Sequence, residues 1–171
     1  MLFRSVKAAL TFARAGEGVH AGKLATKLNQ EFPLDTMMQN YSLPTIQAAI
    51  DLEKNNARGA IQILQVATPY DLGSASFGNL YPVYVRGLAY LKLGQGQQAA
   101  AEFQKVLDHR GIVGNFVIGA LAHLQLGRAQ AMMGDKEAAR KSYQDFLTLW
   151  KDADPDIPIL HAAKAEYAKL I

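Results

Sequence analysis

The stretch Gly87-Leu-Ala-Tyr90-Leu-Lys-Leu-Gly94-Gln-Gly-Gln-Gln-Ala99-Ala-Ala-Glu-Phe103 decides the fold, because its landmarks recur along the whole chain. Turn-forming residues return at spacings of 39, 39 and 40 residues, at Gly16, Asn55, Gly94 and Gly134. Small residues follow five positions later, at Ala21, Ala60, Ala99 and Ala139. A fixed order of turn, small and bulky residues predicts one supersecondary unit stacked on itself.

Apolar residues at helical spacing predict two helices in each repeat. After a first helix around Val6 and Ala9, we expect helices at about 20–30, 44–54, 58–67, 81–93, 97–108, 118–133, 136–151 and 161–170. The sequence therefore predicts an all-α fold: an α-α superhelix whose pairs contact only neighbouring pairs. We expect a single domain, residues 1–171, with repeats at about 2–40, 41–79, 80–119 and 120–154 and a capping helix at about 158–171.

Composition narrows the class of protein. The 171 residues are 50% apolar and 19% charged, with a net charge of +3 from well-mixed residues, so no basic stripe predicts nucleic-acid binding. The chain has no cysteine and no apolar run long enough to span a membrane. The repeat pattern is already under way at Ala9, so we expect a piece of a longer protein. The sequence leaves its compartment open: we expect the cytoplasm, or the outside of the membrane if the parent has an upstream membrane span.

The repeats resemble tetratricopeptide repeats, whose small residues let two antiparallel helices touch. The resemblance rests on the ordered glycine, tyrosine, alanine and aromatic positions Gly87, Tyr90, Gly94, Ala99 and Phe103, and Gly127, Gly134, Ala139 and Tyr143. The period of 39–40 residues exceeds the family's period of about 34, and His123 stands at a usual tryptophan position. Longer helices or loops must therefore absorb the extra residues. The longest loop is expected at 68–79, whose composition predicts the most mobile segment.

The second half also resembles the C-terminal repeat region of bacterial serine/threonine protein kinases, and some transmembrane winged-helix regulators end similarly. The segments that carry this resemblance are 80–90, 102–113, 143–158 and 164–170. The resemblance implies a sensory or scaffolding tail whose catalytic or DNA-binding domain lies upstream.

Known catalytic and metal motifs fail on this chain. His109-Arg110-Gly111 has glycine where a kinase catalytic loop needs aspartate, and no D-F-G occurs, so we expect an exposed loop there and no enzyme activity. The G-x-G-x-x-A strings at Gly16 and Gly94 share one turn position of the repeat, which favours a turn over a dinucleotide site. The four histidines are scattered, and 152–156 lacks the glycine of a calcium loop. We expect no cofactor and no metal.

Recognition by a groove remains. In tetratricopeptide arrays the first helix of each pair lines the concave face, and the resemblance implies that the corresponding residues here bind a protein or peptide. Those positions are Ser42, Thr45, Ala49, Glu53, Tyr81, Tyr84, Leu88, Lys92, Leu124, Arg128 and Met132. Tyr81 and Tyr84 are suited to anchor a peptide, and Lys92 and Arg128 to contact its acidic groups.

Three readings stay open at this point. The first is a non-catalytic interaction module that binds a peptide, a protein or a second copy of the chain along the concave face. The second is a structural spacer, or a self-association module of a transcriptional regulator. The third is a sensor that holds a small molecule between helices.

Overall fold

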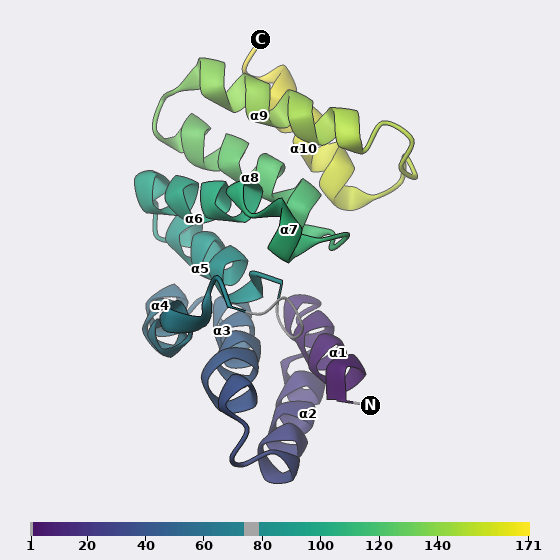
Figure 1. Ribbon diagram of the computed structural model, residues 1–171. Helices are drawn as coiled ribbons and strands as arrows, with labels where there is room; N and C mark the ends of the chain where they lie inside the picture. The colour runs from purple at the N-terminus through teal and green to yellow at the C-terminus, as the bar shows by residue number, and fades with distance from the viewer. Residues whose placement is uncertain (1, 74–78) are drawn as a thin grey trace.

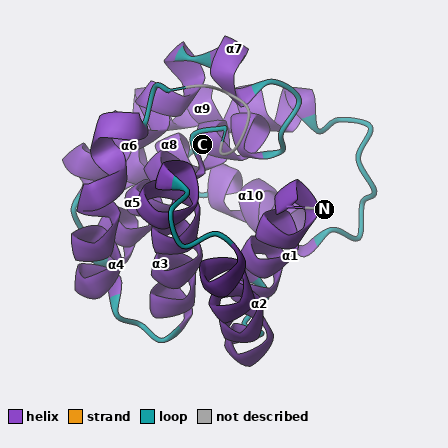
Figure 2. Cartoon of the chain, turned by 60° about the horizontal axis from the view of Figure 1, so that its bottom comes forward, coloured by secondary structure: helices purple, strands orange, loops and turns teal. Residues whose placement is uncertain are grey.

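The computed structural model describes residues 2–73 and 79–171. Figure 2 shows that this part of the chain is built of helices joined by loops, without strands, which confirms the all-α fold class. In chain order the elements are α1 (Leu2–Arg14), α2 (Gly18–Glu31), the π-helical turn η1 (Met38–Ser42), α3 (Leu43–Glu53), α4 (Ala57–Leu64), the 3₁₀ turn η2 (Gln65–Tyr70), α5 (Tyr81–Lys92), α6 (Gly96–Asp108), α7 (Arg110–Val113), α8 (Ile118–Met132), α9 (Lys136–Leu149) and α10 (Pro158–Ala168).

The helices stack as a tetratricopeptide-like superhelix. Within the described ranges, four antiparallel pairs form: α1 with α2, α3 with α4, α5 with α6, and α8 with α9. The first helices, α1, α3, α5 and α8, pack on one another in sequence, and each later one also packs on the second helix of the preceding pair. Figure 1 shows the stack running from α1 and α2 at one end to α9 and α10 at the other.

Each pair turns through the same hairpin. The residue at the repeat's turn position has a positive φ between 60° and 82° in all four repeats: Gly16, Asn55, Gly94 and Gly134. The next amide donates back to a carbonyl five residues earlier, over 2.8–3.0 Å, which is the six-to-one bond of a Schellman turn. Asn55 can fill this left-handed position because asparagine, after glycine, is the residue that tolerates it best. The 39–40 residue period is therefore a period of helix endings.

Small residues set the closeness of the two helices in a pair. A Cβ added to Gly87 would lie 2.7 Å from the Phe103 ring, and one added to Gly127 would lie 2.9 Å from the Tyr143 ring. The alanines of the second helices, at the position shared by Ala21, Ala60, Ala99 and Ala139, are fully buried. The bulky ring of one helix thus packs on the bare backbone of its partner.

The residues by which each repeat exceeds the family's usual period lie between the helix pairs. They form η1, η2 and α7, and a loop over 151–157 that precedes α10. Two expectations need correction here. The 3₁₀ turn η2 covers the first three residues of the expected loop, 68–70, and the Thr68 and Tyr70 carbonyls accept bonds from the amides of Asp71 and Gly73. The expected loop at His109 is largely the short helix α7. Of the predicted mobile loop, residues 74–78 lie outside the described part.

A buried ion network holds η2 against the next pair. Arg86 of α5 donates to Asp71 at 2.6 Å and to Glu102 of α6 at 2.8 Å, and Lys105 lies 3.3 Å from Asp71. Burial lowers the pKa of Arg86, but the bonds with Glu102 and Asp71 outweigh that effect and leave it raised. The network therefore ties the inserted turn to both helices of the third pair.

At the C-terminal end the structure agrees with the predicted helix cap and capping helix. Asp135 caps α9 by accepting from the amide of Ala138 at 3.0 Å, and Pro158 starts α10. Leu160 and Ala163 of α10 are buried against the array, with Tyr167 and Leu170 partly buried beside them. The predicted capping helix is confirmed, and it begins at Pro158, the first residue of the range expected for it. No helix in the described residues is both long and apolar enough to cross a membrane.

Candidate functional site on the inner face

The first helices of the pairs form one face of the array, here called the inner face. Whether a predicted groove residue is buried or accessible on this face depends on its position in the repeat. One shared position is closed: Thr45, Tyr84 and Leu124 are all buried, and Tyr84 is 0% exposed. Each lies where neighbouring first helices pack on one another, so it fills the core between them. The prediction that these three side chains line an open groove is therefore corrected.

Ser42 and Ala49 are buried as well. Ser42 lies in the π-helical turn η1, in which each backbone hydrogen bond spans five residues instead of four. The α-helical spacing from Ala48 therefore does not place Ser42 on the expected face. Ala49 packs in the apolar core of the first two pairs.

Arg128 is exposed only in part, because the capping helix supplies its partner. The Glu166 carboxylate of α10 accepts from Arg128 Nε and Nη2 at 2.8 and 2.7 Å, and from the Tyr143 hydroxyl at 2.7 Å. Burial raises the pKa of Glu166, but these donors outweigh that effect and lower it. Arg128 is thus held by the chain's own carboxylate rather than presented to a partner.

The remaining predicted residues are accessible to different degrees. Glu53 is exposed, and Met132 is 47% exposed. Lys92 is exposed, but its ammonium donates to the Leu52 carbonyl and lies 3.3 Å from Asn55, so it caps the C-terminus of α3. Leu88 and Tyr81 are partly exposed.

Side chains of α1 reach past the second pair to the third. The Arg14 guanidinium lies 5.3 Å from the Tyr84 ring centroid on α5. The Lys7 ammonium lies 4.7 Å from the Tyr81 ring centroid and 3.3 Å from that of Phe116, just before α8. The expectation that pairs contact only neighbouring pairs is corrected at this point, because α1 crosses the inner face.

This crossing leaves a hollow of about 340 Å³ between α1, α5 and the start of α8. We call it the inner-face basin; it is lined by Lys7, Leu10, Thr11, Arg14, Ala15, Tyr81 and Val117. Its charged lining residues are one lysine and one arginine, and no acidic residue lines it. The Lys7 Nζ atom is buried whereas the Arg14 side chain is partly exposed, so Arg14 is the more accessible cation, and the basin suits an acidic group flanked by apolar ones.

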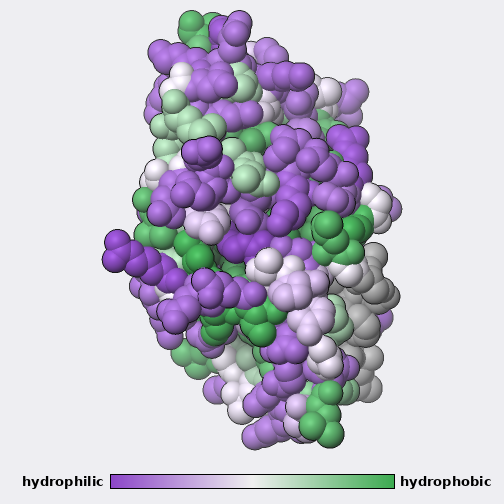
Figure 3. Space-filling view, turned by 60° about the vertical axis from the view of Figure 1, so that its left-hand side comes forward, coloured by the Kyte–Doolittle hydropathy of each residue, from purple (hydrophilic) through white to green (hydrophobic). Residues whose placement is uncertain are grey.

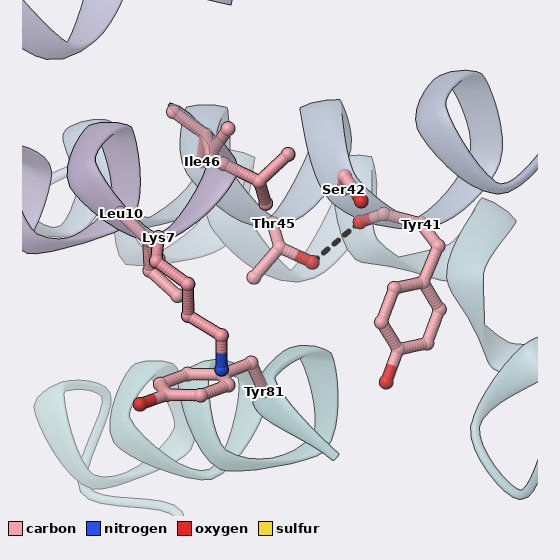
Figure 4. A pocket seen from close by; sticks show the side chains of 8 residues that line it. Lys7, Leu10, Tyr41, Ser42, Thr45, Ile46 and Tyr81 are labelled. Atoms are coloured by element: carbon pink, nitrogen blue, oxygen red, sulfur yellow. Dashed lines mark hydrogen bonds between the residues drawn. The ribbon is translucent and has the colours of Figure 1, made fainter. Parts of the chain in front are cut away.

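A smaller cavity shares Lys7, Leu10 and Tyr81 with the basin, and Figure 4 shows the side chains that line it. Its volume of about 10 Å³ is close to the least that holds one water. Three predicted groove residues, Ser42, Thr45 and Tyr81, meet around it, together with Val6, Lys7, Leu10, Tyr41 and Ile46. The Thr45 hydroxyl donates to the Tyr41 carbonyl, so it is satisfied within the helix.

The basin's surroundings shift its titrating groups. Burial lowers the pKa of the Lys7 ammonium to about 8. Burial also raises the pKa of the Tyr81 hydroxyl, which the nearby Arg14 charge partly opposes. Lys7 therefore carries a charge that moderately alkaline pH removes.

Sequence reasoning missed Lys7 and Arg14, although a signal for Arg14 was present. Arg14 lies 39 residues before Glu53, in the repeat position that Lys92 and Met132 also hold. The groove positions are counted from Ala48, Gly87 and Gly127, and the same count from Ala9 reaches Arg14. Lys7 has no such signal, because only the curvature of the array brings it to Tyr81.

Comparison with known proteins agrees with the fold. Over 66 residues the chain is 41% identical to a tetratricopeptide repeat and J domain-containing co-chaperone of Fusarium oxysporum f. sp. lycopersici. That match covers 38% of this chain, and the chain spans only 11% of the co-chaperone's length. No protein-family profile matches the chain, and no solved structure does. The helix pairs and this relative support tetratricopeptide-like character, which is typical of modules that bind other proteins.

Proposed function

We propose that this chain is a non-catalytic protein-interaction module, and that it binds an acidic, partly apolar peptide segment of a partner in the inner-face basin. The observation that carries the proposal is the basin's lining: Lys7 and Arg14 supply positive charge beside Leu10, Tyr81 and Val117. A peptide carboxylate gains charge-assisted contacts there, while an apolar neighbour covers the ring of Tyr81.

The proposal narrows the predicted groove. Glu53, Tyr81, Leu88, Lys92 and Met132 remain as accessible positions around or beyond the basin. Tyr84, Thr45 and Leu124 act in the core, and Arg128 acts in closing the C-terminal end. Two aromatic rings were expected to anchor the peptide; in the proposal Tyr81 does so alone.

The absence of enzyme activity is part of the proposal. In the described residues no three histidine or acidic side chains gather as a metal site would require. The raised pKa of Arg86 and the lowered pKa of Glu166 are explained by ion pairs within the fold. Binding therefore accounts for the basin without a catalytic step.

For the parent protein, we retain two hypotheses. The resemblance of segments 102–113 and 143–158 to bacterial serine/threonine kinase tails supports a scaffolding role beside a kinase domain. The tetratricopeptide co-chaperone relative supports a role in which such repeats bind proteins alongside another domain. Both hypotheses use the same basin, and the sequence upstream in the gene distinguishes them.

A fluorescence anisotropy titration tests the proposal with a labelled peptide that alternates glutamate and leucine. We expect saturable binding that Arg14→Gln weakens about tenfold, because one charge-assisted contact is lost. The matched control is Arg58→Gln, an exposed arginine on α4, which should bind as the parent does.

The same peptide with lysine in place of glutamate should not bind. Equal binding of both peptides, or equal affinity of the Arg14→Gln and parent proteins, would overturn the basin as the site. Circular dichroism of each variant checks that the helices persist.

A further inference from the structure

A second hollow, which shares Val117 with the inner-face basin, lies where α7 packs between α6 and α8. Its volume is about 410 Å³, within the range of small-molecule sites. We call it the α7 pocket; it is lined by Val106, Leu107, Arg110, Val113, Gly114, Asn115, Phe116, Val117, Gly119, Ala120, His123 and Leu149. None of the predicted groove residues lies in it.

The walls of the α7 pocket are mostly apolar. Val106 and Val113 belong to the buried core, whereas Val117 and Leu149 are 45% and 56% exposed and face solvent at the pocket's edge. Exposed valine and leucine beside a hollow leave apolar surface that a ligand can cover. The chain thus offers an apolar bed at this position.

The polar groups of the pocket are few and carry no negative charge. Arg110 at the start of α7 is exposed, and among the described residues no ion pair joins it to a carboxylate. Burial lowers the pKa of His123, an effect that Asp145 opposes and Arg110 reinforces, so its ring is neutral at pH 7. Arg110 is therefore the charge that a ligand meets.

The lining of a neighbouring hollow indicates on which side of Arg110 an anionic group is favoured. That hollow shares Leu107, Arg110 and His123 with the α7 pocket, but Asp108, Asp145 and Lys141 line it as well. The two carboxylates offset the positive charges of Arg110 and Lys141 there, so an anionic group is favoured on the α7 side of Arg110, where no carboxylate lines the pocket. The apolar end of the same ligand then lies along Val113, Val117 and Leu149.

The pocket exists because of residues beyond the usual repeat period. The α7 turn and the segment before α8 form its end wall, and the Asn79 side chain fixes α7 by donating to the Ile112 carbonyl at 3.0 Å. Gly114 has a φ of 58°, which turns the chain away from α7 and opens the space. The wall is thus held in place before any ligand arrives.

We propose that the α7 pocket binds a small amphipathic carboxylate, with its anionic head at Arg110 and its apolar chain along Val113, Val117 and Leu149. This binding is separate from peptide capture at the inner-face basin. The two hollows share only Val117 as a lining residue.

Decanoate, kept below its micelle-forming concentration, is the probe, and isothermal titration calorimetry with ¹H–¹⁵N NMR is the measurement. We expect saturable binding that shifts the amides of 106–123. Arg110→Gln should weaken it about tenfold, since a charge-assisted contact is lost. Ala120→Leu should abolish it by filling the pocket, and Ala101→Leu, on the exposed face of α6, is the matched control that leaves it unchanged.

Comparing decanol with decanoate separates the contribution of the charge from that of apolar contact. Comparing Arg14→Gln with Arg110→Gln shows which of the two hollows holds the anion. Equal affinities for decanol and decanoate, or no saturable binding, would overturn the proposal. So would a loss of decanoate binding in Arg14→Gln rather than in Arg110→Gln, because the anion would then lie in the inner-face basin. The result for decanoate leaves the peptide titration of the inner-face basin unaffected, so the two proposals fail separately.

Discussion

The two ends of the inner face treat their arginines differently. At the C-terminal end, Arg128 is clasped by Glu166 of α10, and Tyr143 donates to the same carboxylate. At the N-terminal end, Arg14 lies over the Tyr84 ring, and no ion pair of the described residues joins it to a carboxylate. One end is closed by the chain's own acid, whereas the arginine of the other end has no such carboxylate among the described residues and is partly exposed.

The difference teaches that repeat position alone does not define a binding surface. The capping helix changes one end, and the curvature of the array brings α1 across the other. The surface elsewhere is more uniform: Figure 3 shows a largely hydrophilic face with apolar side chains in separate small patches. The contrast between the two ends is therefore where function and structure can be separated by experiment.

The largest expected effect tests whether the two halves share one packing rule. Ala60→Leu and Ala139→Leu place three extra carbon atoms at equivalent, fully buried positions of α4 and α9. Each should lower the free energy of unfolding by ~1–3 kcal/mol through overpacking. Urea denaturation measures it, with exposed Ala101→Leu as control; an unchanged midpoint in either half would show that its repeat register is misassigned.

Replacing each of the two arginines with glutamine tests the contrast directly. Arg128→Gln removes two bonds to Glu166 and should lower the free energy of unfolding by ~1–2 kcal/mol, discounted for partial exposure of the pair. Arg14→Gln should cost only about 0.5 kcal/mol, from the lost contact with the Tyr84 ring. Thermal unfolding of both variants decides; equal costs would remove the distinction between a structural and a presented arginine.

The pH dependence of the C-terminal clasp sharpens the same point. The pKa of Glu166 is lower in the folded state than its usual value, so the unfolded state binds more protons as the solution is acidified. The stabilisation is present above the unfolded pKa of a glutamate and is lost as pH falls through the folded value. The stability advantage over Glu166→Gln should therefore shrink on acidification. An advantage independent of pH would contradict the clasp.

The smallest expected effect concerns the N-terminal end. Because the pKa of Lys7 is lowered to about 8, its ammonium is charged below that pH and neutral above it. Affinity for the acidic peptide should fall about two- to fivefold as pH rises through this value, the size of a partly exposed charge contact. Lys7→Met should remove the dependence. A parent protein with the same affinity on both sides of pH 8 would place the peptide away from Lys7.

The sequence predicted the repeat unit well because each landmark acts locally. The glycine and asparagine of the turns specify left-handed helix endings, and Gly87 and Gly127 specify close helix contact. It predicted the groove poorly because accessibility depends on packing between repeats. Tyr84 holds a groove position by count, yet Arg14 of α1 and Phe103 of α6 enclose its ring.

By itself, the sequence determined an all-α superhelix of helix pairs with a capping helix, since periodicity and turn chemistry act over a few residues. Only the tertiary structure decided which charges are available: that Glu166 satisfies Arg128, that Lys7 reaches Tyr81 and Phe116, and that Arg110 borders an apolar hollow. The physical reason is that ion pairing and exposure are set by distances between residues far apart in the chain, which no local pattern encodes.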